Sequence, residues 1–243
     1  MNFAKTFLIA SVAALSSLLL SACGSIVTGP ELAEKSPLVV SQVPLTSASY
    51  FADYSQDGAL PFTCEVRMNS DKLIRRDYTW KDEKGGEKKV SIVINGGKAV
   101  KIEDGKTSEI DPYDTEMTRF FAGLVFSPDT IVSSADESVR RGHDGTPLYV
   151  YGVRLNGVSG VASCVLNVDP DSRLWTGLSV SMKDGSEIVS TFHEYRTVSG
   201  VTYPSLIFSS AGDGGASVRC VIRDVKINPE LPDELFELPD TNG

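Results

Sequence analysis

The residue with the clearest chemistry in this sequence is Cys23, a thiol that follows the small residues Ser21 and Ala22. One cation, Lys5, precedes an apolar stretch over residues 7–20, which gives the order of charge, apolar segment and small residues that is typical of secretory signals. The apolar stretch is too short to span a bilayer as a mature helix. The pattern therefore predicts an export signal that is removed and that leaves a thiol close to the new N-terminus.

The run Leu20-Ser21-Ala22-Cys23 resembles the bacterial lipobox, in which a diacylglyceryl group is attached to the cysteine thiol and the signal is cut just before it. The resemblance implies cleavage after residue 22, lipidation of Cys23 and a lipid anchor in the cell envelope, facing the periplasm or the exterior. Two or more acyl chains give stable anchoring where one does not. Neither Gly24 nor Ser25 is the Asp that retains enterobacterial lipoproteins at the inner membrane, so the outer membrane is favoured where the organism has one. The alternative is an exported protein whose apolar segment ends near a cysteine by chance.

The two histidines, His143 and His193, lie in patterns that indicate no catalytic site. His143 stands in a polar loop run, and His193 stands in a strand-like run where its neighbours point to the opposite face. The chain contains no HExxH, GxSxG, GxGxxG or P-loop pattern and no acidic ladder of the EF-hand kind. We therefore expect no enzyme activity, no cofactor and no metal site. A glycosidase pair among the many carboxylates is an alternative that the sequence leaves open.

Three further cysteines, Cys64, Cys164 and Cys220, remain if Cys23 is acylated. No two of them are spaced as CxxC, which argues against a redox motif or a zinc knuckle. Outside the cytoplasm, an odd count indicates either one disulfide with a leftover thiol or three buried thiols. Cys164 and Cys220 lie in similar strand-like runs and are the preferred disulfide pair, with three packed thiols as the alternative.

The charge of the chain argues against one class of partner. The 243 residues include 23 Lys and Arg and 32 Asp and Glu, which give a net charge of −9. Removing residues 1–22 takes away Lys5 and no acidic residue, so the net charge of the mature chain is about −10. Such a chain repels the phosphates of nucleic acids and of anionic lipids. We expect no nucleic-acid partner, and attachment to the membrane through the acyl anchor.

Short runs of alternating apolar and polar residues fill most of the chain beyond residue 60 and predict an antiparallel meander. Turn signals such as Asp104-Gly105 and Asp184-Gly185 separate them and supply the positive φ that tight hairpins need. The predicted strands lie at residues 62–68, 90–94, 148–155, 164–168, 174–182, 188–195, 201–209 and 218–227. Residues 23–46, rich in Ser, Pro and Thr, predict a flexible tether, and residues 47–243 predict a single domain.

One segment departs from the strand pattern and predicts a helix. Asp111 stands where an N-cap would, and Pro112 follows at the first helical position. The apolar face that follows at helical spacing consists of Met117, Phe120, Phe121 and Leu124. A single amphipathic helix in a meander must lay this face on the sheet. It either fills the concave side permanently or covers it as a lid, and both alternatives stay open.

The second half of the sequence carries an ordered set of motifs. They read Val168-Asp-Pro-Asp-Ser-Arg-Leu, Met182-Lys-Asp-Gly, Phe192-His-Glu-Tyr-Arg-Thr-Val-Ser-Gly-Val-Thr-Tyr-Pro, Val221-Ile-Arg-Asp-Val-Lys-Ile-Asn and Phe236-Glu-Leu-Pro. This order resembles the LolA-like superfamily, which includes lipoprotein-sorting carriers, LppX- and LprG-type lipoproteins and RseB-like sensor domains. The match covers residues 148–239, with looser agreement from residue 60. No long helix precedes the strand at residue 62, and only residues 47–54 stand in the place of a first lid helix.

The resemblance implies a curved antiparallel half-barrel of about ten or eleven strands with one or two lid helices on its concave face. It also implies a cavity for acyl chains or other hydrophobic ligands, and no covalent chemistry. The residues expected at the cavity mouth are Met117, Phe120, Phe121 and Leu124. Because fold analogy does not fix function, two classes stay open. One is an anchored lipoprotein that binds or carries a lipid, and the other is an anchored interaction or envelope-sensor module with a protein partner.

Overall fold

The computed structural model describes residues 45–70, 72–126, 136–141, 147–153, 160–169, 171–211 and 217–239. This part of the chain contains thirteen strands, one α-helix, α2 (Pro112–Phe126), and a 3-10 helix, η2 (Asp233–Phe236). The strands are β1 (Ala48–Gln56), β2 (Phe62–Met68), β3 (Leu73–Lys81), β4 (Glu87–Asn95), β5 (Lys98–Glu103), β6 (Lys106–Glu109), β7 (Asp136–Arg141), β8 (Pro147–Val153), β9 (Val161–Val168), β10 (Trp175–Met182), β11 (Glu187–Val198), β12 (Val201–Ala211) and β13 (Val218–Ile227).

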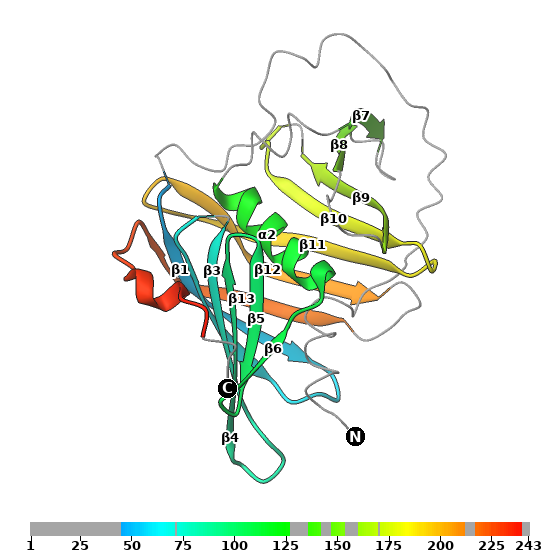
Figure 1. The fold of residues 1–243 in the computed structure, drawn as a ribbon. Coiled ribbons are helices and arrows are strands. Elements are labelled where there is room, and N and C mark those ends of the chain that lie inside the picture. The colour runs from blue at the N-terminus through cyan, green and yellow to red at the C-terminus, as the bar shows by residue number, and fades with distance from the viewer. Residues whose placement is uncertain are drawn as a thin grey trace.

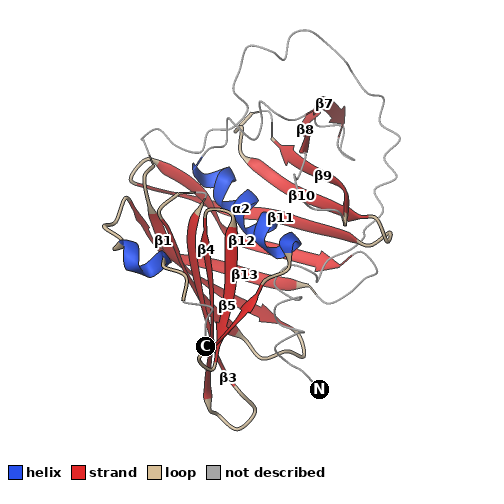
Figure 2. Ribbon diagram, in the orientation of Figure 1, coloured by secondary structure: helices blue, strands red, loops and turns tan. Residues whose placement is uncertain are grey.

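All thirteen strands form one sheet in the order β6-β5-β4-β3-β2-β1-β13-β12-β11-β10-β9-β8-β7. Neighbours in the sheet are neighbours in the chain except in the middle, where the antiparallel pair β1–β13 joins the first strand to the last. The strands β6 and β7 are the two edges, so the sheet is not closed. It curves around α2, which lies across its concave side (Figures 1 and 2). The predicted curved antiparallel half-barrel is confirmed.

Tight hairpins connect neighbouring strands where the sequence predicts them. Asp104 and Gly105, between β5 and β6, have φ angles of 50° and 74°, the two positive values that a type I′ turn requires. Ser199 and Gly200, between β11 and β12, have φ angles of 47° and 80° and make the same arrangement. These short connections explain why consecutive strands pair along most of the sheet.

The strand β1 corrects one expectation. Residues 47–54 do not stand in the place of a lid helix, because Ala48–Gln56 form a strand that pairs with β2 on one side and β13 on the other. Small and aromatic residues alternate along it, which suits a pleated strand and leaves only a weak apolar pattern in the sequence. The strand count is therefore thirteen, above the ten or eleven expected.

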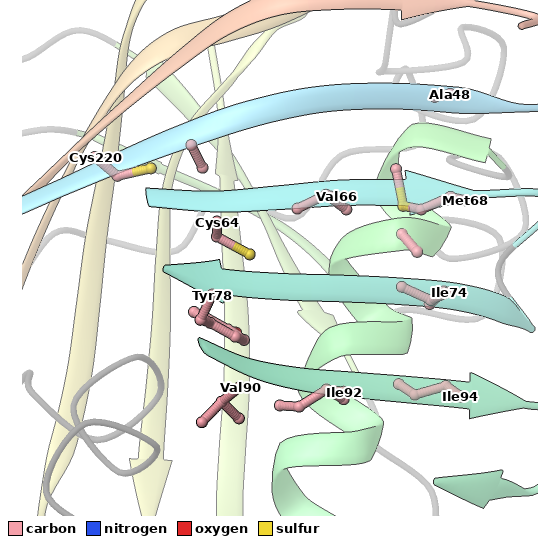
Figure 3. Close-up of a cluster of buried hydrophobic side chains, with 12 residues drawn as sticks. Ala48, Cys64, Val66, Met68, Ile74, Tyr78, Val90, Ile92, Ile94 and Cys220 are labelled. Atoms are coloured by element: carbon pink, nitrogen blue, oxygen red, sulfur yellow. The ribbon is translucent and has the colours of Figure 1, made fainter. Parts of the chain in front are cut away.

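Two clusters of buried side chains lie between the sheet and α2. The first is formed by β8–β11 with Phe120 of α2, and the second by β1–β4 and β13 with Ala122 of α2. Figure 3 shows Met68, Ile74 and Ile94 of the second cluster side by side across β2, β3 and β4. Because α2 contributes to both clusters, it joins the two halves of the sheet. We therefore expect the sheet and α2 to fold as one unit.

On the opposite, convex face of the sheet, Asp77 forms ion pairs and η2 packs against the strands. The Asp77 side chain is 7% exposed, and its carboxylate lies 2.7 Å from Nη1 of Arg67 and 3.0 Å from Nε of Arg75. Burial acts to raise the pKa of Asp77, but hydrogen bonds, of which that from Arg75 is the largest, hold it below its ordinary value. Arg75 also donates to the backbone carbonyl of Leu235 at 3.2 Å, next to Phe236, which is 1% exposed. The C-terminal motif therefore packs against the back of β3 and β4.

Candidate functional site

A cavity of about 210 Å³ lies between the concave face of the sheet and α2. Most of its wall is apolar and includes Val66 and Met68 from β2, Ile188 from β11 and Ile207 from β12. An apolar cavity of about 150 Å³ is large enough to hold benzene. The space under α2 therefore suits a segment of hydrocarbon.

Helix α2 contributes Met117, Thr118 and Ala122 to the cavity wall. Phe120 is buried as well, but it packs in the first cluster instead of lining the cavity. Of the predicted apolar face, Met117 thus both lines the cavity and packs in the first cluster, whereas Phe120 packs in that cluster alone. The side chains of two other predicted residues, Phe121 and Leu124, lie outside the described part of the structure. In its described part, the helix both lines the cavity and packs in the hydrophobic core.

The start of α2 is held by Asp111, as the sequence predicts. Its Oδ1 accepts a hydrogen bond from the backbone N–H of Tyr113 at 2.7 Å, and its carbonyl accepts one from the N–H of Thr115 at 3.1 Å. The first bond satisfies a donor that the first turn of a helix cannot pair internally, and the second is the first regular hydrogen bond of the helix. The cap thereby sets where α2 begins and which of its residues face the sheet.

Asp114, in the first turn of α2, has a raised pKa. Burial and then the negative charge of Asp111 raise the pKa of Asp114 from 3.8 to about 6, against the opposing effect of the Arg76 cation. An acid whose pKa is higher in the folded state stabilises the fold in its neutral form. That stabilisation is complete below pH 3.8 and is lost as the pH rises through about 6.

We therefore expect Asp114→Asn to be more stable than the wild type near neutral pH and equal to it in acid. The gain should be about 1 kcal/mol, because solvent around the half-buried carboxylate screens part of the effect. Urea unfolding at about pH 4 and about pH 8 measures the difference. Glu116→Gln is the matched control on the same helix, where Glu116 pairs with Arg119 at 3.1 Å and should gain nothing at high pH. An Asp114→Asn variant that is less stable than the wild type at pH 8 would contradict the expectation.

The three internal cysteines are free and buried. Cys164 of β9 belongs to the first cluster and Cys220 of β13 to the second, and β10, β11 and β12 lie between these strands. Neighbouring strands are about 4.8 Å apart, whereas a disulfide needs Cα atoms within about 7 Å. The predicted Cys164–Cys220 disulfide is therefore wrong, and three packed thiols describe the structure. Burial raises the pKa of Cys164 and of Cys220 to about 12, which makes both thiols poor nucleophiles.

One cation, Arg76 of β3, lies in the wall of this apolar cavity. Its Nη1 donates to the Thr118 hydroxyl on α2 at 3.1 Å, and its guanidinium carbon lies 5.1 Å from the centre of the Tyr78 ring. Burial acts to lower the pKa of Arg76, but its neighbours, Tyr78 first among them, raise it well above its ordinary value. Arg76 therefore keeps its charge inside the cavity.

Phenol groups lie beside Arg76. Tyr50 and Tyr54 line the cavity from β1, and Arg76 acts electrostatically on both. Burial is the main cause that raises the pKa of each tyrosine, so both hydroxyls stay neutral and can donate hydrogen bonds. An apolar wall with a few polar groups gathered together is typical of sites that bind a hydrophobic ligand in one orientation.

His193 lies away from this cavity. It is exposed on β11, with its Nε2 at 2.9 Å from the Thr191 hydroxyl and its ring against Phe208, while His143 lies outside the described residues. Among the described residues, no group of three or more His, Cys, Asp and Glu is arranged to hold a metal ion. None of the described helices is long and apolar enough to cross a membrane.

Three solved structures share this architecture. A LolA superfamily protein from Nitrosomonas europaea has a TM-score of 0.60 at 13% identity, over 87% of this chain and 98% of that one. A domain described as an outer-membrane lipoprotein-sorting protein, from Vibrio parahaemolyticus, has a TM-score of 0.59 at 10% identity, over 81% and 91%. This chain has the LolA-like fold. A DUF1329 family protein from Desulfovibrio piger has a TM-score of 0.55 at 12% identity, over 79% and 90%.

The similarity between this chain and the LolA-like structures is limited to the fold. No protein-family model matches the sequence, and no curated protein sequence is similar to it. At identities of 10–13%, the comparison establishes how the chain folds and leaves its ligand and partners to be argued from its own residues.

Within the LolA-like fold, sequence reasoning missed the polar groups of the cavity. Arg76 lies on β3, a strand that was not among those predicted, and Tyr50 and Tyr54 lie on β1, which was assigned to no element. The alternation of Ile74, Arg76 and Tyr78 was a signal that could have found β3. A charged residue at an inward position interrupts the apolar pattern, which is why the strand is weak in the sequence.

Proposed function

We propose that this protein is a lipoprotein of the bacterial cell envelope, anchored through an acylated Cys23, that binds or carries a lipid or acyl ligand in the cavity under α2. The observation that carries the proposal is the apolar cavity itself. Protein interiors are packed almost without voids, and an unfilled apolar space costs stability. An acyl chain in this space would recover the lost contacts.

The setting of the cavity supports the proposal. It lies in a LolA-like fold, and one of the similar structures is described as an outer-membrane lipoprotein-sorting domain. The lipobox-like run ending at Cys23, followed by a tether, would hold the domain at the membrane that supplies its ligand. The protein would then face the periplasm or the exterior, with the outer membrane favoured where there is one.

Native mass spectrometry of residues 24–243, produced in bacterial cells, tests the proposal directly. These residues include the whole sheet and α2 and omit only the expected signal segment and Cys23, the expected site of lipidation. Co-purified lipid, seen as a defined additional mass that dissociates on activation, is the expected result. A clean mass without ligand, and no binding of added fatty acids, would favour the interaction or sensor module.

A matched pair of variants on β12 should locate the ligand. Ile207 lines the cavity, whereas Phe208, the next residue, is 37% exposed on the other face. We expect Ile207→Asn to lower the affinity for a neutral hydrophobic probe at least about tenfold, because an amide placed against hydrocarbon loses its hydrogen bonds to water. Phe208→Asn should bind the probe as the wild type does. Equal affinities for the two variants, measured by fluorescence titration, would place the ligand elsewhere.

A further inference from the structure

Among the described residues, Arg76 has no carboxylate partner, unlike Arg67, Arg75 and Arg223 of the same sheet. On the convex face, Arg75 pairs with Asp77 at 3.0 Å, and Arg223 pairs with Asp53 at 2.6 Å. In the described part of the chain, no carboxylate oxygen lies within 4.0 Å of the Arg76 guanidinium. The cation that lines the apolar cavity thus has no anion beside it within this part of the chain.

The acid that Arg76 influences from a distance does not neutralise it. Arg76 acts to lower the pKa of Asp114, but that pKa still stands at about 6, above its ordinary value. Asp53 behaves in the opposite way, since the hydrogen bond from its arginine partner holds its pKa below the ordinary value. The contrast agrees with the geometry, in which Asp114 and Arg76 share no salt bridge.

The known contacts of Arg76 leave hydrogen-bonding capacity free. A guanidinium has five N–H donors, and the Thr118 hydroxyl at 3.1 Å and the Cys64 thiol account for only part of them. Donors of a half-buried cation in an apolar wall are costly to leave without an anion. The planar fork of a guanidinium matches the two oxygens of a carboxylate or a phosphate.

We infer that Arg76 is the head-group subsite of the cavity and that the ligand is a single-chain amphiphile with a carboxylate or phosphate head group. The inference rests on the proposed function, because the hydrocarbon tail must lie against the apolar wall around Val66 and Ile207. The neutral hydroxyls of Tyr50 and Tyr54, which lie in electrostatic reach of Arg76, are further donors for the head group. The cavity volume of about 210 Å³ favours one chain over several.

Competition binding tests the inference with ligands that differ only at the head. Residues 24–243 are loaded with the neutral probe N-phenyl-1-naphthylamine, which is displaced by palmitate, by hexadecanol or by palmitoyl lysophosphatidate at about pH 8, below their micellar concentrations. The wild type should prefer the anions to the alcohol at least about tenfold. Palmitate and lysophosphatidate distinguish a carboxylate head from a phosphate head, and tight binding of either supports the subsite.

Variants of the subsite separate charge from structure. Arg76→Met removes the charge at similar volume and should weaken palmitate at least about tenfold, while hexadecanol stays within about threefold. Arg223→Met is the matched control, because it removes an arginine that pairs with Asp53 at 2.6 Å outside the cavity wall, and it should keep the preference for anions. Melting curves followed by circular dichroism establish that each variant is folded.

Three results would overturn the inference. One is a wild type that binds hexadecanol as tightly as palmitate, and another is an Arg76→Met variant that keeps the preference. If Arg76→Met does not fold, Arg76→Lys takes its place, and it should lower the affinity for palmitate more than the affinity for hexadecanol. An equal change in both affinities is the third result that would overturn the inference. A wild type that binds neither the probe nor any of the ligands would instead refute the proposed function, so the two failures are distinguishable.

Discussion

A Cys23→Ser variant should carry no acyl chain and should accumulate as the unprocessed precursor. The pattern ending at Cys23 resembles one in which lipid is transferred to the thiol before the signal is cut, and a serine hydroxyl is a far weaker nucleophile than a thiolate. The internal cysteines are buried and offer no substitute. We expect incorporation of labelled palmitate to fall to background, a change of about tenfold or more.

The control for this variant is Ser25→Ala, which leaves the run from Leu20 to Cys23 intact and should be labelled and processed as the wild type is. After cell fractionation, we expect the control in the membrane fraction. The Cys23→Ser protein should also be in that fraction, but attached only through its uncleaved signal segment. Palmitate that enters Cys23→Ser as strongly as the wild type would show that the anchor lies elsewhere.

Phe120→Ala should lower the free energy of unfolding by about 3–5 kcal/mol. Phe120 is 6% exposed and lies in the first cluster with Tyr151 and Trp175, and it does not itself line the cavity. Deleting its ring leaves a void among side chains that the strands β8–β11 hold apart, so the neighbours cannot close it fully. Urea unfolding measures the loss, and the slope of the transition shows whether folding stays two-state.

Met117→Ala is the comparison that separates the role of α2 in the core from its role in ligand binding. Met117 is buried but also lines the cavity, so part of its surface has no partner to lose when the ligand is absent. We expect a smaller cost of about 2 kcal/mol, together with a larger loss of affinity for a hydrophobic probe than in Phe120→Ala. If Phe120→Ala instead costs less than about 1 kcal/mol while abolishing probe binding, α2 is a lid and not a part of the core.

Sequence patterns predict well the elements that local chemistry decides. The strands around Cys64, Cys164 and Leu178 were foreseen because alternation of apolar and polar residues reports a strand with one buried face. The helix start at Asp111 was foreseen because a side chain caps its own helix within a few residues. The half-barrel followed from the resemblance of ordered motifs in the second half, which the structure confirms as a LolA-like fold.

Contacts between distant segments were the ones that sequence patterns did not reveal. The pairing of Cys164 with Cys220 was predicted from similar runs, but strand order places three strands between them. The strand β1 escaped notice because Ala48 and Ala52 make a weak apolar pattern, although both are buried once β2 and β13 flank them.

By itself, the sequence determined the acidic character of the chain, the β-meander and the capped helix, because each depends on composition or on residues that are close together in the chain. The export signal and the lipidation of Cys23 stay predictions of the same local kind. Only the tertiary structure decided which residues share the cavity. It placed Met117 both in the core and in the cavity wall and Phe120 in the core alone, and it placed Arg76 among apolar walls. The reason is that register and curvature bring together residues from β1, β3, β12 and α2, and these relations depend on the whole sheet and leave no local pattern.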